Sequence, residues 1–129
     1  MKGALTMGYF VVRKTNTGVK FDLHAGNHEV IATSEVYASD ASCKKGIASV
    51  RRNAPVAGVQ DLTEEPVATV HCPKFEVYKD KGGEFRFRLK ATNGQIIAVS
   101  EGYTSMAGCL NGIESVRKNA PEGEVNVQE

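Results

Sequence analysis

Three basic side chains alternate along one stretch in the second half of the chain, at Arg86, Arg88 and Lys90. Alternate residues of a β-strand point to the same face of a sheet, so a strand here would carry these charges in one row. Tyr78, in the stretch before it, could add an aromatic ring to that face. Cations beside an aromatic ring can hold phosphate groups or single-stranded nucleic acid. This row is therefore the first candidate binding site.

Acidic residues near the row weaken the nucleic-acid interpretation. Glu76 and Glu84 could pair with the basic residues across neighbouring strands, which would make the row an ordinary salt-bridged surface. The corresponding outward positions in the first half, Lys20, Asp22 and His24, carry mixed charge, so no continuous basic track would cross the molecule. Nucleic acid, or another polyanion, is the alternative partner rather than the favoured one.

A second set of candidates comes from an internal duplication. The same offset separates Tyr37 from Tyr103 and Cys43 from Cys109, and it continues through the segments that follow. Apolar matches between the halves follow from a shared core, so the matched polar residues are the informative ones. They could form two polar sites related by twofold symmetry, between each strand-to-helix connection and the end of each helix. The matched pairs are Ser34 and Ser100, Glu35 and Glu101, Tyr37 and Tyr103, Ser49 and Ser115, Arg51 and Arg117, and Asn53 and Asn119.

A structural interpretation of these matched pairs is favoured. Serine suits the end of a strand and asparagine suits the end of a helix, while Arg51 and Arg117 would meet the negative end of a helix dipole. Either matched glutamate could pair with an arginine. Either matched tyrosine could bury its ring while its hydroxyl reaches water. The sequence therefore favours a structural role for most of these residues over a role in a binding or catalytic site.

Catalytic and metal-binding motifs are not recognisable in the sequence. No serine, cysteine or threonine lies in a known nucleophile motif, and no glycine-rich loop joins a predicted strand to a helix. Cys43 and Cys109 are expected to be buried on helices, which makes them poor nucleophiles. The pair His71-Cys72 is a weak metal signal, because no ligand pair has zinc spacing. We expect no catalytic residue, cofactor or metal, and an unrecognised enzyme is the second alternative.

The composition is that of a soluble globular protein. Of the 129 residues, 41% are apolar and 24% are charged, and 16 basic against 15 acidic residues leave a net charge of +1. This near-neutral charge argues against a protein built mainly to grip nucleic acid or an anionic membrane. The sequence shows neither a signal peptide nor an apolar run of membrane-spanning length, and its three cysteines are odd in number. We therefore expect a cytoplasmic protein without membrane association.

Period-two alternation between turn signals predicts the strands. Asn93-Gly94 predicts a two-residue hairpin turn with positive φ at both central positions, and Asn27-His28 is its counterpart. The predicted strands are 9–13, 19–25, 30–34 and 59–63 in the first half and 75–78, 85–91, 96–100 and 125–128 in the second, with an extra strand at 67–70.

One helix is predicted after the third strand of each half. Ser39 and Ser105 stand where an N-cap belongs, and apolar residues then recur at helical spacing up to the prolines that end each helix. Gly46 and Gly112, in the middle of these helices, are expected to let the helix approach the sheet closely.

The predicted organisation is two tandem β-β-β-α-β repeats that share one core. Repeat 1 spans 9–63 and repeat 2 spans 74–129, with an N-terminal extension at 1–8 and a linker at 64–73. One helix cannot cover the sheet of a single repeat, so two repeats with one sheet bury more apolar surface. The expected α+β fold is one antiparallel sheet of about eight strands with two helices on one face, related by an approximate twofold axis.

The second half resembles the YegP-like family of small, often duplicated bacterial and archaeal domains. The resemblance rests on residues 75–80, 85–91, 93–97, 100–103 and 112–120, and more loosely on 9–55. It implies paired three-strand, helix, strand units in one sheet, with the closing strands exchanged between units and with homodimers for single-copy relatives. It implies no catalytic residues, and for this tandem chain it favours a monomer.

The sequence thus predicts a non-enzymatic binding or interaction module. The sequence does not identify its partner; a protein that contacts the uncovered sheet face or the matched polar positions is one candidate. Nucleic-acid or polyanion binding through Arg86, Arg88, Lys90 and Tyr78 is the alternative.

Overall fold

The computed structural model describes residues 8–128, so the predicted N-terminal extension, apart from Gly8, lies outside the described residues. Alternating apolar positions form the strands, and buried apolar residues at helical spacing form the helices, as the sequence predicts. Repeat 1 consists of β1 (Tyr9–Lys14), β2 (Val19–His24), β3 (Val30–Thr33), α1 (Asp40–Asn53), a short 3₁₀ turn (Ala54–Val56) and β4 (Gly58–Asp61). Repeat 2 consists of β5 (Lys74–Lys79), β6 (Phe85–Lys90), β7 (Ile96–Val99), α2 (Met106–Asn119) and β8 (Glu124–Val127).

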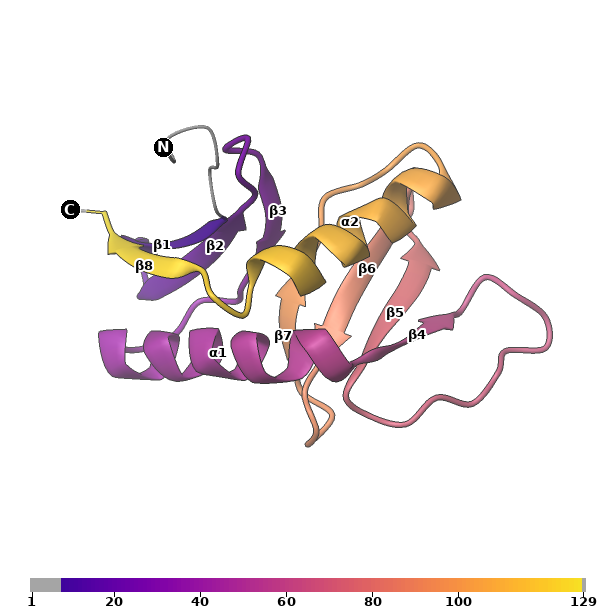
Figure 1. Cartoon of the computed structure of the whole chain (residues 1–129), viewed down its shortest axis with the longest axis horizontal. Coiled ribbons are helices and arrows are strands. Elements are labelled where there is room, and N and C mark those ends of the chain that lie inside the picture. The colour runs from indigo at the N-terminus through magenta and orange to yellow at the C-terminus, as the bar shows by residue number, and fades with distance from the viewer. Residues whose placement is uncertain (1–7, 129) are drawn as a thin grey trace.

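All eight strands form a single sheet in the order β4-β5-β6-β7-β3-β2-β1-β8. The approximate twofold axis passes between β3 and β7, where Thr33 pairs with Val99. Both helices lie on the same face of this sheet (Figure 1). The predicted α+β architecture of two repeats in one sheet is confirmed.

The closing strands are exchanged between the repeats. Strand β4 of repeat 1 pairs with β5 of repeat 2, and β8 of repeat 2 pairs with β1 of repeat 1. Both pairings are parallel, so the sheet is mixed, and the expectation of an entirely antiparallel sheet is wrong at its two edges. A hairpin imposes antiparallel pairing, whereas β4 reaches β5 through the long segment 62–73, which permits a parallel pair.

The extra strand predicted at 67–70 is absent from this segment. This stretch contacts β4 through side chains, including a hydrogen bond from the side chain of Gln60 to the carbonyl of Ala68 at 2.8 Å, and forms no ladder of backbone bonds. Pro66, which lacks an N–H, precedes the stretch, and Val67 remains exposed. The apolar character of the segment therefore does not make it a strand.

The helices begin where the sequence predicts. The side chain of Ser39 accepts a hydrogen bond from the amide of Ser42 at 3.1 Å, and Ser105 accepts one from Gly108 at 3.0 Å. Helix α1 packs on β2 and β7, while α2 packs on β6 and β3. Each helix therefore covers strands of both repeats, and the two repeats share one core. The largest fully buried side chains of that core are Phe10, Phe21, Phe75 and Phe87.

The glycine in the middle of each helix makes room for a tyrosine. A Cβ on Gly46 would overlap the Tyr37 hydroxyl and would lie 3.1 Å from the ring of Phe21. Gly112 has the same relation to Tyr103. Each glycine thus permits the predicted close approach, but the group that it accommodates is a tyrosine side chain between the helix and the sheet.

The hairpin between β2 and β3 has a three-residue loop. The carbonyl of Ala25 accepts from the amide of His28 at 2.9 Å, and the amide of Ala25 donates to the carbonyl of Glu29 at 2.8 Å. His28 alone has positive φ in this loop, at 75°, as Gly94 does at 85° in repeat 2. The predicted two-residue turn is therefore wrong, because a turn followed by one left-handed residue satisfies both backbone bonds.

Candidate binding face

The face of the sheet opposite the helices, here called the open face, carries the predicted basic row. In β6, Arg86, Arg88 and Lys90 alternate with the buried Phe87 and Leu89, so their side chains point away from the core. Across the ladder they face Tyr78, Glu76 and Lys74 of β5, respectively. We call these six residues together with Asp80 the repeat 2 patch.

Glu76 lies at the centre of the repeat 2 patch and is only 4% exposed. The Arg88 Nε lies 2.7 Å from its carboxylate, and the ammonium groups of Lys74 and Lys90 lie at 3.2 and 3.3 Å. Burial by itself would raise the pKa of Glu76, but the hydrogen bonds from Arg88, Lys74 and Lys90 outweigh burial and hold that pKa below its usual value. The predicted cross-strand role of Glu76 is confirmed.

Asp80 is the second carboxylate of the patch and binds Arg86. The Arg86 Nε lies 2.7 Å from the Asp80 carboxylate, and a second guanidinium nitrogen donates to the Ser100 carbonyl at 3.1 Å. The hydrogen bond from Arg86, with backbone amides of the turn, lowers the pKa of Asp80. The carboxylate expected here, Glu84, instead packs beside Gly102. Asp80 takes its place because the turn after β5 brings that residue back over β6.

The ring of Tyr78 is covered. The Arg88 guanidinium lies over it, 4.6 Å from the ring centroid, in a cation–π contact. The structure therefore brings Tyr78, Arg86, Arg88 and Lys90 together, as predicted, but the ring is engaged by the protein itself. Base stacking on that side would require Arg88 to move.

Charge in the repeat 2 patch is only partly compensated. Its four cations, Lys74, Arg86, Arg88 and Lys90, face two carboxylates, which leaves an excess of positive charge. Side-chain exposure of these cations ranges from 14% for Lys74 to 36% for Arg86, so they are held against the sheet. The patch is a positively charged surface whose cations form ion pairs with Glu76 and Asp80.

The open face of repeat 1 differs. There, Arg13 pairs with Asp22 at 2.7 Å, and the hydroxyl of Thr33 donates to the same carboxylate at 2.6 Å. Tyr9 stacks on His24, with ring centroids 4.8 Å apart. This mixed charge interrupts the basic surface, as the sequence predicts.

A tyrosine and two histidines also meet at this end of the sheet. The Tyr9 hydroxyl lies 2.9 Å from Nδ1 of His28, and Nδ1 of His24 donates to the His28 carbonyl at 2.9 Å. The sequence pattern does not predict this cluster, because only the hairpin register brings Tyr9 beside its two partners. Across residues 8–128 no group of three metal-ligating side chains is found.

Most of the matched polar residues stabilise the fold. The hydroxyl of Ser34 accepts from the amide of Phe21 at 3.0 Å and donates to the carbonyl of Glu35 at 2.7 Å, and Ser100 does the same in repeat 2. The side-chain amides of Asn53 and Asn119 donate to backbone carbonyls one helical turn earlier, each at 2.8 Å. These pairs match because both repeats need the same backbone partners.

Arg51 and Arg117 hold the exchanged strands. Arg51 donates to the carbonyl of Gly123, just before β8, and Arg117 donates to the carbonyl of Ala57, just before β4. Each guanidinium also lies over a core ring, Phe10 or Phe75, at 5.5 Å from the centroid. The expected contact with the helix dipole is therefore the lesser part of their role, because each side chain reaches across to a segment distant in sequence.

The matched tyrosines are packed on the core. Tyr37 stacks on Phe21 and Tyr103 on Phe87, with centroids 6.2 and 6.3 Å apart. Burial raises the pKa of both hydroxyls, and it also raises the pKa of the Cys109 thiol to about 11. Such groups stay protonated at neutral pH, which disfavours them as nucleophiles.

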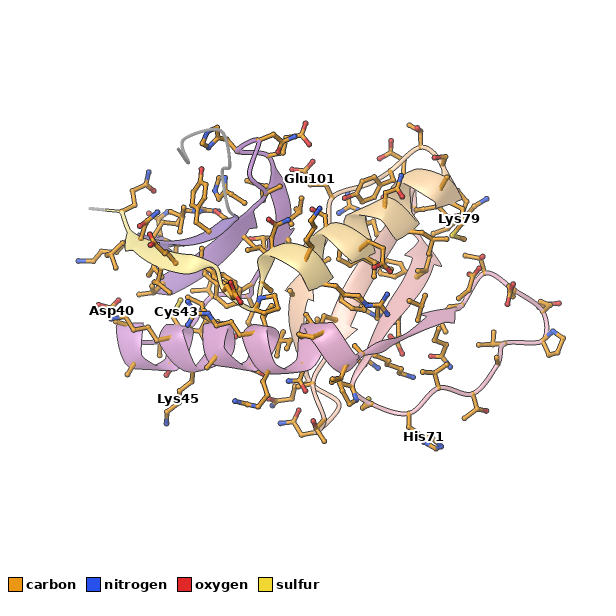
Figure 2. All side chains as sticks on the ribbon, viewed as in Figure 1. Asp40, Cys43, Lys45, His71, Lys79 and Glu101 are labelled. Atoms are coloured by element: carbon orange, nitrogen blue, oxygen red, sulfur yellow. The ribbon has the colours of Figure 1, made fainter. Side chains whose placement is uncertain are left out.

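Glu35 and Glu101 remain as the exposed members of the matched set. Neither forms an ion pair among the residues that the structure describes, so the predicted pairing with an arginine does not occur there. Glu101 lies beside β3, on the segment that follows β7 (Figure 2). Of the matched polar residues, these two have the least part in holding the fold.

Both repeats match the same protein family. The family profile "Domain of unknown function (DUF1508)" fits residues 15–61 and again residues 80–126. A UPF0339 protein of Bordetella pertussis is 47% identical over 115 residues, which cover 88% of this chain and 89% of that protein. A UPF0339 protein of Treponema denticola is 71% identical over 52 residues, 40% of this chain but 90% of its own length, so it spans about one repeat.

Solved structures show the same fold. The solution NMR structure of yegP from E. coli, titled a protein of unknown function, superposes with a TM-score of 0.76 at 37% identity, covering 98% of this chain and 97% of that chain. A UPF0339 protein from Shewanella oneidensis also gives a TM-score of 0.76, at 34% identity, covering 94% of this chain and 91% of that chain. The resemblance stated from the sequence is confirmed.

Proposed function

The chain belongs to the DUF1508 family, the YegP-like proteins of unknown function, and from that premise we propose that it is a non-enzymatic binding module for an acidic protein surface. The proposed contact surface is the repeat 2 patch. The observation that carries the proposal is that four cations and only two carboxylates lie on the sheet face opposite both helices of the described residues. Complementary charge raises the rate at which such a partner associates and helps to fix its register on the surface.

The geometry of the patch supports binding without rearrangement. Glu76 and Asp80 fix Arg86, Arg88 and Lys90 in place through contacts of 2.7 to 3.3 Å. Side chains that are already ordered lose little rotamer entropy when a partner binds. The patch therefore fits a protein surface whose carboxylates meet the outer edges of these cations.

A protein partner fits better than nucleic acid. The Tyr78 ring is covered by Arg88, and the positive surface ends at repeat 1, where Asp22 pairs with Arg13. The affinity of a protein for nucleic acid increases with the number of phosphates that it neutralises. A short patch on a near-neutral chain can neutralise only a few of them. Nucleic acid remains the alternative that the experiment must separate.

We also propose that the chain acts as a monomer, because its duplication supplies both halves of the sheet. A molar mass in solution, measured by light scattering, that equals twice the mass of the chain would contradict this proposal. None of the helices in the described part is long and apolar enough to cross a membrane.

The test is affinity capture with three baits: the wild type, an Arg86→Gln, Arg88→Gln variant, and a Lys44→Gln, Lys45→Gln variant. The last pair lies exposed on α1 and matches the change in charge. We expect a protein that is lost from the patch variant, retained by the helix variant and weakened by salt. Circular dichroism verifies that each bait is folded.

Nuclease treatment separates the two kinds of partner. Retention of the captured protein after nuclease supports a protein surface, and its loss, or recovery of oligonucleotide alone, supports the nucleic-acid alternative. Equal capture by the wild type and the patch variant would exclude the repeat 2 patch as the contact surface.

A further inference from the structure

The open face of repeat 1 contains a shallow depression of about 270 Å³ that is separate from the repeat 2 patch. It lies where β1, β2 and β3 meet β7, so both repeats contribute to it. Charged side chains of both signs surround small apolar ones. The lining includes Arg13, Lys20, Asp22, Val30, Val99 and Glu101.

Two of these charges are available to a ligand. Asp22 is only 7% exposed, and its carboxylate is already bound by Arg13 and Thr33. In the described chain, neither the ammonium of Lys20 nor the carboxylate of Glu101 has a side-chain hydrogen bond or ion pair. The depression therefore has one unpaired cation and one unpaired anion.

The equivalent position in repeat 2 is filled by the protein itself. Tyr78 and Arg88 occupy the places that Arg13 and Asp22 take in repeat 1, and they stack on each other. Asp22 is shorter than its counterpart Arg88, and this difference leaves space in repeat 1 that the arginine side chain occupies in repeat 2.

We propose that this depression binds a small aliphatic zwitterion of the size of a free amino acid. Two cations and two carboxylates balance, so a neutral ligand with both charges fits better than an anion or a cation. Its carboxylate would face Lys20 and its ammonium would face Glu101. A depression of about 270 Å³ would hold roughly nine waters at about 30 Å³ each, so it has room for an amino acid with a branched aliphatic side chain.

The apolar lining supports an aliphatic side chain. Val30 and Val99 lie half-buried at the junction of the two repeats and can cover a few methyl groups. This site goes beyond the proposed protein contact, since it uses the other half of the open face. Either can fail while the other stands.

The experiment is an NMR titration of the ¹⁵N-labelled protein with L-leucine. Two analogues each lack one charge: 4-methylpentanoate has no ammonium, and 3-methylbutylamine has no carboxylate. We expect saturable amide shifts confined to the depression, around Lys20, Thr33 and Val99, with each analogue binding about tenfold more weakly. Equal binding of leucine and one analogue would overturn the zwitterion assignment.

Matched variants test the two charges. Lys20→Gln and Glu101→Gln should each weaken leucine binding about tenfold. Glu35→Gln is the control, because Glu35 is the exposed counterpart of Glu101 in the other repeat. Absence of saturable shifts in the wild type, or an equal effect of Glu35→Gln and Glu101→Gln, would overturn the proposal.

Discussion

The two repeats have the same strands and helix but carry different chemistry on the open face. Val11 and Asp22 face each other across the first hairpin of repeat 1, whereas the same positions in repeat 2 hold Glu76 and Arg88. On the core side, Phe21 and Phe87 occupy equivalent buried places. The difference shows that packing constrains one face of the sheet, while the other face has been free to diverge.

The largest expected effect on stability concerns the shared core. We expect Phe21→Ala and Phe87→Ala to lower the free energy of unfolding by similar amounts, about 3–5 kcal/mol each, because both rings are fully buried beneath a helix. Urea denaturation measures both. A small effect in one repeat beside a large effect in the other would show that the cores are not equivalent.

The next test addresses the carboxylate that only repeat 2 has. Glu76→Gln should lower the free energy of unfolding by about 1–3 kcal/mol at neutral pH, since three cations lose their shared anion. Glu101→Gln, which removes an exposed and unpaired carboxylate, is the control and should change stability little. Equal stability of both variants would contradict a stabilising role for the Glu76 cluster.

The same carboxylate predicts a dependence on pH. The folded state lowers the pKa of Glu76 below 4.5, its ordinary value, so its stabilising contribution is complete above that pH. The contribution is lost as the pH falls from 4.5 through the lower folded value. Denaturation midpoints measured down this range should therefore fall less steeply in Glu76→Gln than in the wild type. Parallel curves would count against this assignment.

A smaller effect should distinguish the two exchanged strands. We expect Arg51→Met and Arg117→Met each to reduce stability by about 1–2 kcal/mol, through loss of a hydrogen bond and a contact with a ring. Hydrogen exchange should become faster in β8 for Arg51→Met and in β4 for Arg117→Met. A uniform increase over both strands would show that the arginines do not act locally.

The smallest effect concerns the hairpin at His28. His28→Gly should relieve an unfavourable positive φ but lose the contact with the Tyr9 hydroxyl, so the net change should stay within about 0.5 kcal/mol. In a Tyr9→Phe background the same change should be more stabilising, because no contact remains to be lost. A double-mutant cycle in urea measures the difference, and additive effects would exclude the coupling.

Features that depend on local sequence could be predicted. The caps at Ser39 and Ser105, the strand alternation and the repeat itself are read from neighbouring residues, and the structure confirms them. The same is true of the row at Arg86, Arg88 and Lys90, because side chains in a strand alternate.

Features that depend on contacts between distant segments could not be predicted. The acceptor of Arg51 is the carbonyl of Gly123, and no local pattern links the two. The choice of Asp80 over Glu84 depends on the path of one turn, and the parallel edges depend on where each helix delivers the chain. The depression at Lys20 and Glu101 likewise exists only once the two repeats meet.

The exchange of closing strands has a consequence for the integrity of the molecule after cleavage. A single protease cut in the segment 62–73 would produce two fragments, each of which keeps its closing strand in the sheet of the other. Each fragment supplies the edge strand that the other lacks, so the two could be expressed separately and allowed to reassemble. The molecule is therefore suited to use as a split reporter, in which neither half alone has a complete sheet edge.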